Sequence, residues 1–172
     1  MPLALLLLAA VAQDFPQPTL RSVETDKTQA APGEIVRVAF EIELPAGWHL
    51  YPAAPTTTGI PTSFQIEGFE LAGKVEEPEP KTEPAKGLIP AYQYHEGTVR
   101  MVVPARRKAG SKAGPVEIRG SMTYQICGGP RKECSLPMKL AFGAAAPAPV
   151  PAGADLPSSG LGGFLLSAAG GG

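Results

Sequence analysis

Residues 35–47 read IVRVAFEIELPAG and indicate the class of fold. Apolar and polar residues alternate with a period of two over much of it, which is typical of a half-buried β-strand, and Pro45-Ala46-Gly47 predicts a turn after it. The rest of the chain shows no sustained 3.6-residue apolar repeat. About seven or eight short strands separated by turn residues predict an all-β, antiparallel sandwich. The other strands are expected at residues 48–51, 63–67, 69–75, 97–103, 116–127 and 138–142.

Composition sets broad limits on the class of protein. The chain has 172 residues, of which 44% are apolar, and this is enough for one domain with a real core. Its net charge is −1 and the two signs are interspersed, so nothing indicates binding to nucleic acid or to an anionic membrane surface. With only two cysteines, most of the stability must come from burial rather than from cross-links.

The two ends of the chain differ from its middle. Residues 1–12 carry a short apolar run and a small-x-small pattern before Gln13, which predict a signal peptide, although a buried N-terminal strand is the alternative. The globular domain is expected at residues 15–143. An Ala/Pro-rich linker follows at 144–159, and residues 160–172 resemble the start of a truncated transmembrane segment or, alternatively, a disordered Gly/Ala tail.

The two cysteines, Cys127 and Cys134, have six residues between them, including a Gly-Gly-Pro turn, so they can pair locally. Strand alternation places Met122, Tyr124 and Ile126 on one face and Cys127 on the other, away from the main core. Closing so short a loop would stabilise the fold by about 2.5 kcal/mol, which is enough for a structural disulfide. A redox couple would instead need an accessible sulfur and a tuned thiolate, and the residues alone leave both interpretations open.

One connection is unusual in composition. Residues 76–90 contain four prolines, four acidic residues, two lysines and a glycine. A connection of this length without structure of its own is usually functional or disordered.

Several motifs together resemble a known family. In order along the chain they are GWHLY at 47–51, GIPT at 59–62, PEPK at 78–81, YHEG at 94–97, and YQIC at 124–127 followed by CSLP at 134–137. This series resembles the N-terminal periplasmic domain of the DsbD family of thiol:disulfide interchange proteins, over roughly residues 20–142. The linker and the apolar tail also lie where that family begins its transmembrane electron-transfer domain.

The resemblance implies an immunoglobulin-like sandwich with a cysteine-bearing hairpin and a protein-disulfide reductase activity without metal or organic cofactor. Cys134 would form the mixed disulfide with partners, and Cys127 would be the resolving thiol. The domain would be periplasmic and tethered to the inner membrane. It would relay reducing equivalents from the membrane electron-transfer domain of the same full-length protein. The implied recipients are thioredoxin-like periplasmic proteins, namely disulfide isomerases and cytochrome c maturation thioredoxins.

The resemblance also implies a loop that shields the pair, and residues 76–90 occupy its place. The site-shielding or supporting residues are then expected to be His49, Tyr51, Leu88, Ile89, Tyr92 and Tyr124. Tyr51 matches an aromatic position of the family. The preceding aromatic position of the family is occupied here by His49, which is a departure from the family pattern. Ordinary strand packing is the alternative role for His49 and Tyr51.

Two rival functions remain open. One is an exported, non-catalytic binding module whose disulfide is purely structural. The other is copper handling by soft ligands, for which the chain offers no clustered motif. Its candidate ligands would be His49, His95, Met101, Met122 and Met138.

Overall fold

The structure, a computed structural model, describes residues 15–143. The expected signal peptide, linker and transmembrane start at 1–12, 144–159 and 160–172 lie outside these described residues. Within 15–143 no helix is long and apolar enough to cross a membrane. The strands, in chain order, are β1 (Thr19–Thr25), β2 (Gln29–Ala30), β3 (Ile35–Glu43), β4 (Trp48–Leu50), β5 (Ser63–Ile66), β6 (Phe69–Leu71), β7 (Lys81–Glu83), β8 (Tyr92–Glu96), β9 (Thr98–Arg107), β10 (Gly114–Pro115), β11 (Gly120–Tyr124), β12 (Ile126–Gly128), β13 (Glu133–Cys134) and β14 (Met138–Phe142).

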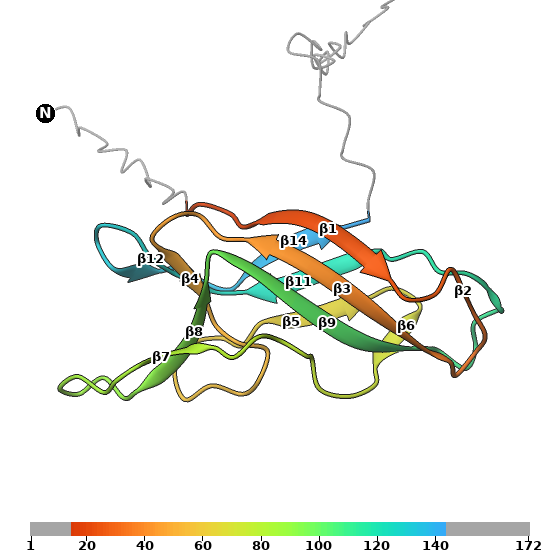
Figure 1. Cartoon of the computed structure of the whole chain (residues 1–172), viewed down its shortest axis with the longest axis horizontal. Helices are drawn as coiled ribbons and strands as arrows, with labels where there is room; N and C mark the ends of the chain where they lie inside the picture. The colour runs from red at the N-terminus through yellow and green to blue at the C-terminus, as the bar shows by residue number, and fades with distance from the viewer. Residues whose placement is uncertain (1–14, 144–172) are drawn as a thin grey trace, which may run out of the picture.

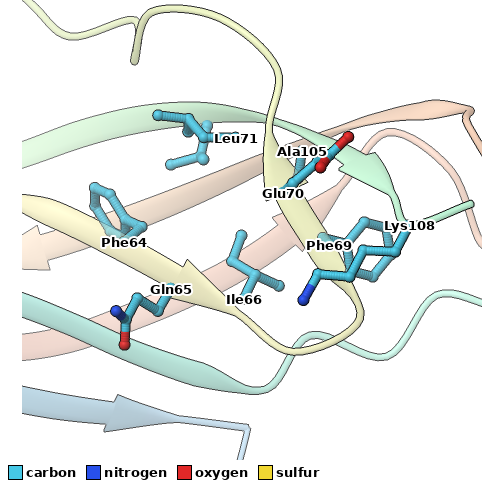
Figure 2. Close-up of a pocket in the computed structure, with 9 residues that line it drawn as sticks. Phe64, Gln65, Ile66, Phe69, Glu70, Leu71, Ala105 and Lys108 are labelled. Atoms are coloured by element: carbon cyan, nitrogen blue, oxygen red, sulfur yellow. The ribbon is translucent and has the colours of Figure 1, made fainter.

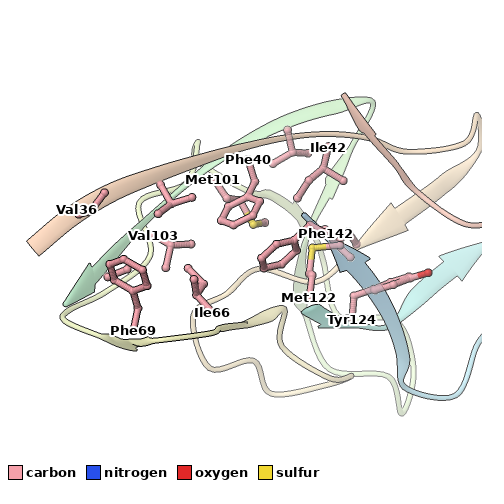
Figure 3. Packing of buried hydrophobic residues seen from close by; sticks show 14 of the residues in the cluster. Val36, Phe40, Ile42, Ile66, Phe69, Met101, Val103, Met122, Tyr124 and Phe142 are labelled. Atoms are coloured by element: carbon pink, nitrogen blue, oxygen red, sulfur yellow. The ribbon is translucent and has the colours of Figure 1, made fainter. Parts of the chain in front are cut away.

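Two antiparallel sheets form the sandwich. One has the strand order β1-β3-β9-β6 and the other β14-β11-β5 (Figure 1). The ring of Phe40 on β3 lies 4.7 Å from that of Phe64 on β5 and 4.9 Å from that of Phe142 on β14, centroid to centroid, so the two sheets pack face to face. Figure 3 shows this core. Its largest fully buried members include Phe40, Ile42, Met101, Met122 and Tyr124.

This arrangement confirms the all-β, antiparallel, immunoglobulin-like sandwich expected from the sequence. Strand β3 explains why the alternation was informative. Val36, Val38, Phe40 and Ile42 are each at most 1% exposed, because they face the second sheet. The residues between them, apart from the small Ala39, keep contact with solvent.

A third sheet, with the order β13-β12-β4-β8-β7, extends from one end of the sandwich (Figure 1). It is made from continuations of sandwich strands: β12 follows β11 after Gln125, and β8 is separated from β9 only by Gly97. The disulfide belongs to this sheet. The disulfide is therefore carried by a sheet that lies at one end of the sandwich.

A pocket of about 330 Å³ lies on the sandwich itself, where β5, β6 and β9 meet (Figure 2). None of the residues that line it is a cysteine or a histidine, so it offers no group for thiol chemistry. Its lining consists of Phe64, Gln65, Ile66, Phe69, Glu70, Leu71, Val103, Ala105 and Lys108. The disulfide lies in a different sheet, and this pocket is therefore not part of the candidate site.

Three local expectations were wrong. The strand was expected to end before Pro104, but β9 continues through it. Pro104 lies opposite Arg37 on β3, and the backbone N–H and C=O of Arg37 form their hydrogen bonds with Asp26 rather than with Pro104. Proline is tolerated there because its missing donor is not needed by β3. The segment 116–127 divides at Gln125, so that β11 pairs with β14 and β12 pairs with β13. Residues 76–90 also contain strand β7, which forms a hairpin with β8, so this connection has structure of its own.

Candidate functional site

The two cysteines lie directly opposite each other on neighbouring strands. Cys127 is the central residue of β12, Cys134 ends β13, and their Sγ atoms are joined in a disulfide with a Cα–Cα distance of 4.0 Å. The loop between them closes with a turn in which the Lys132 N–H donates to the Gly129 carbonyl over 3.1 Å. Lys132 adopts a left-handed backbone with φ of 51°. The pairing is therefore local, as expected from the turn residues.

The two sulfur-bearing residues differ sharply in exposure. Cys127 is only 3% exposed, whereas Cys134 is an exposed residue of an edge strand. Cys127 is nevertheless outside the main core, which includes its neighbour Ile126. The alternation therefore predicted its face correctly, and a separate layer of side chains buries it.

Tyr51 is part of that layer. Its hydroxyl oxygen lies 3.7 Å from Cys127 Sγ. A disulfide sulfur has no proton, so the phenol is the donor in this weak contact. Tyr51 itself is 6% exposed, and burial raises the pKa of its hydroxyl, which stays protonated at neutral pH.

A row of paired residues runs from the disulfide across the sheet. Cys134 pairs with Cys127, Cys127 with His49 on β4, and His49 with Glu96 on β8. Directly opposed residues of antiparallel strands point to the same face. Together with alternate residues on the same strands they form one surface, which we call the cysteine face. Its members are Cys134, Cys127, His49, Glu96, Tyr51, Tyr92 and Tyr94.

Aromatic rings cover this face next to the disulfide. The His49 ring centroid lies 4.9 Å from that of Tyr94, 5.9 Å from that of Tyr92 and 6.0 Å from that of Tyr51. Burial among these rings lowers the pKa of His49, although Glu96 and Glu83 oppose the shift. Burial also raises the pKa of Tyr92. Glu96 of this face is engaged in an ion pair with Lys81.

Two residues that the sequence did not single out hold the strand of Cys134 in place. The Gln125 side chain accepts from the Ile60 N–H over 3.0 Å and donates to the Ser135 carbonyl over 2.8 Å. Ser135 is 2% exposed, and its hydroxyl accepts from the Ile126 N–H over 3.2 Å. In the sequence, the alternation indicates a continuous strand through Gln125. The signal that could have identified Gln125 is its amide side chain, which stands at the point where the strand changes its pairing partner.

The loop of residues 52–61 packs against the cysteine face, and a glycine makes this possible. Gly59 has φ of +78°, and a Cβ there would lie 2.1 Å from Cε2 of Tyr51. The loop is closed by the Thr62 hydroxyl, which donates to the Tyr51 carbonyl over 2.6 Å. Gly59 belongs to the GIPT motif, but its contact with Tyr51 could not be predicted from the sequence.

The opposite face of the third sheet carries a buried polar pair. Nε2 of His95, a residue 4% exposed, lies 3.1 Å from Glu77 Oε2. Glu77 also accepts from the N–H groups of Ala53 and Ala54, over 2.9 and 3.3 Å. Burial acts to raise the pKa of Glu77, but these hydrogen bonds together outweigh it and lower the pKa. The pair ties the start of the 52–61 loop to β8.

The remaining expected site residues lie elsewhere. Leu88 is fully exposed and Ile89 is 58% exposed, at the tip of the β7–β8 hairpin. This tip and the loop after β12 project from the same end of the molecule but apart from each other (Figure 1). Tyr124 belongs to the sandwich core at 0% exposure, and burial raises its pKa. The structure therefore brings His49, Tyr51 and Tyr92 together near the disulfide, but not Leu88, Ile89 or Tyr124.

The candidate copper ligands do not lie together either. Met101 and Met122 are core residues, and His49 and His95 are on opposite faces of the third sheet. Among residues 15–143 no group of three or more His, Cys, Asp or Glu side chains could hold a metal ion.

Solved structures similar to this chain include two N-terminal domains. The N-terminal domain of DsbD from Neisseria meningitidis, in the reduced form, matches with a TM-score of 0.44 and 14% identity over 69% of this chain and 82% of that one. The N-terminal periplasmic domain of ScsB from Proteus mirabilis matches with a TM-score of 0.44 and 16% identity over 69% of this chain and 42% of that one. No curated protein matches the chain in sequence.

A comparison with protein families also gives a match. The family described as thiol:disulfide interchange protein DsbD, N-terminal, matches residues 17–145. This range contains the whole sandwich, the third sheet and both cysteines. The chain therefore belongs to the family of the N-terminal, thiol–disulfide exchange domain of the interchange protein DsbD.

Proposed function

We propose that this domain relays reducing equivalents from a membrane electron-transfer domain of the same full-length protein to thioredoxin-like periplasmic proteins. Residues 1–12 would direct export, and residues 144–172 would connect the domain to the inner membrane. The observation that carries the proposal is the unequal exposure of the two cysteines. A permanent structural cross-link does not require one sulfur-bearing residue at an open sheet edge, whereas exchange requires an accessible sulfur.

The chemistry needs only the two sulfurs and thiols from the partners. A donor thiolate attacks Sγ of Cys134, the Cys127–Cys134 bond breaks, and its electron pair leaves with Cys127. A second donor thiol then resolves the mixed disulfide and leaves the domain as a dithiol. In the forward transfer, the Cys134 thiolate attacks the disulfide of the recipient. Cys127 then attacks Cys134 Sγ and releases the recipient as a dithiol, so two electrons and two protons pass in each cycle.

Trapping experiments test the assignment of roles. Cys127→Ser leaves the exposed thiol, whose thiolate is expected to attack a thioredoxin in which the resolving cysteine is replaced by serine and the remaining cysteine carries thionitrobenzoate as a disulfide. Thionitrobenzoate leaves, and the mixed disulfide between the two proteins accumulates because neither has a second thiol to resolve it. Cys134→Ser is the matched control, since it leaves only the buried thiol, and should trap little. Equal trapping by the two variants would contradict the assignment of Cys134 as the attacking residue.

The reduction potential tests the function itself. A working couple should equilibrate with glutathione buffers near the potentials of periplasmic carriers, whereas a structural disulfide is expected below about −300 mV. A potential in the structural range, together with no transfer of electrons to any thioredoxin-like protein, would favour the non-catalytic binding module instead.

A further inference from the structure

His49 is the titratable side chain that lies directly across from Cys127. The two residues are Cα partners on β4 and β12, at the centre of the third sheet. Side chains at such positions share one face, with Cβ atoms about 5 Å apart. An imidazole ring at this distance can reach the neighbouring sulfur directly or through one water molecule.

The surroundings of His49 favour its neutral, proton-accepting form. From its own strand it faces Tyr51, and its ring is half-buried against two tyrosines of β8. The nearby carboxylates act in the opposite direction, but Glu96 is paired with Lys81. The balance is a lowered pKa caused by burial. The titratable and charged groups that face His49 are Cys127, Tyr51, Tyr92, Tyr94, Glu96, Lys81 and Glu83.

The buried position of Cys127 creates a need for such a group. A thiol in apolar surroundings has little thiolate character, and the thiolate is the nucleophile. Cys134 is exposed and can lose its proton to solvent, but Cys127 is 3% exposed and has limited access to water. Tyr51 is the other polar group near the sulfur. It cannot accept the proton, because its own hydroxyl stays protonated.

We propose that His49 is the base that removes the proton of the Cys127 thiol when the disulfide re-forms. This inference rests on the exchange function proposed above. In this step neutral His49 takes the proton, and the Cys127 thiolate attacks Cys134 Sγ in the mixed disulfide. The Cys134–partner bond breaks, and its electron pair leaves with the partner sulfur, which then takes a proton from the imidazolium or from water. In the reverse direction the same imidazolium protonates Cys127 as it leaves.

The test separates the two sulfur steps within one reaction. The reduced domain is mixed with dithiobis(nitrobenzoate), which releases one coloured thiolate when Cys134 attacks and a second when Cys127 closes the disulfide. Both phases are followed by stopped-flow absorbance across a range of pH. In the wild type, the second phase should slow as pH falls through the titration of His49 and should level off above it.

His49→Gln should slow only the second phase, by about a hundredfold at neutral pH, which is the lower end of general-base contributions. Its rate should then rise continuously with pH as the thiol itself ionises. His95→Gln is the matched control, because it makes the same change on the opposite face of the sheet and should leave the pH profile of the second phase as in the wild type.

Two results would overturn the proposal: an unchanged second phase in His49→Gln, or an equal slowing of both phases, which would show that His49 acts only through packing. Failure of the proposed function is distinguishable. In that case both phases remain measurable in the wild type, while transfer to thioredoxin-like proteins is absent.

Discussion

Replacement of Gly59 by alanine tests whether the 52–61 loop holds Tyr51 over the disulfide. The new Cβ would lie 2.1 Å from Cε2 and 2.3 Å from Cζ of Tyr51, whereas ordinary contacts begin near 3.4 Å. Both sides of this contact are held in place. The Ile60 N–H is bonded to Gln125, and the Tyr51 carbonyl accepts from Thr62.

Two costs add in this variant. A non-glycine residue at φ of +78° costs about 1 kcal/mol. Forcing a methyl group into a packed contact costs about 1–3 kcal/mol more. We therefore expect Gly59→Ala to lower the free energy of unfolding by about 2–4 kcal/mol. Gly33→Ala provides a matched control, because Gly33 has φ of +81° but a methyl group there would meet no neighbouring atom within 4 Å, so only the backbone cost of about 1 kcal/mol applies.

Urea unfolding of the oxidised proteins measures both losses. Because a displaced Tyr51 would uncover Cys127, Gly59→Ala should also be reduced faster by dithiothreitol than Gly33→Ala. If the two variants lose the same stability and are reduced at the same rate, the loop does not hold Tyr51 against the disulfide and the reasoning fails.

Three further predictions concern the groups around the site. In urea unfolding, the double variant Cys127→Ser/Cys134→Ser should have a free energy of unfolding about 2.5 kcal/mol lower than that of the oxidised wild type, because this is the value expected for closing so short a loop. A far larger loss would show that loop entropy is not the main effect of the disulfide. Because the pKa of Glu77 is lowered in the folded state, its stabilisation is present above the unfolded carboxyl pKa of about 4.3 and is lost as pH falls through the lower folded value. Glu77→Ala should therefore lose about 1–3 kcal/mol at neutral pH and less in acid, and a loss that is independent of pH in thermal unfolding would argue against the pair. Gln125→Ala removes both bonds that join Ile60 and Ser135, so it should cost about 1–2 kcal/mol and speed amide hydrogen exchange at Ile60, and unchanged exchange there would mean that the amide bridge does not restrain the loop.

Some features of the fold were predictable because they depend on local patterns. The alternation in residues 35–44 indicates burial on one face, and β3 buries that face as expected. The turn between the cysteines likewise brings its ends together without help from distant segments. Pro104 was misleading for the opposite reason. Whether a proline ends a strand depends on which neighbour needs its missing N–H, and the answer lies in the pairing of Arg37 with Asp26.

Some residues of the candidate site could also be predicted from the sequence, and others could not. The pair Cys127 and Cys134 could be identified from the sequence, and the resemblance added His49, Tyr51 and Tyr92. The contacts of Gln125, Gly59 and Glu77 could not be identified, because each joins segments that are separated by many residues or depends on how a loop packs. Leu88 and Ile89 are expected near the disulfide only by their place in the chain, whereas the β7–β8 hairpin that carries them lies at the edge of the third sheet opposite to β13.

The class of fold, the local pairing of the cysteines and the face on which Cys127 lies could be predicted from the sequence, because they follow from periodicity and from short chain separations. The burial of Cys127, the exposure of Cys134 and the place of His49 beside the buried sulfur became known from the structure. Exposure and cross-strand contacts depend on strand order in the third sheet. That order places β12 between β4 and β13, an arrangement that no single stretch of sequence encodes.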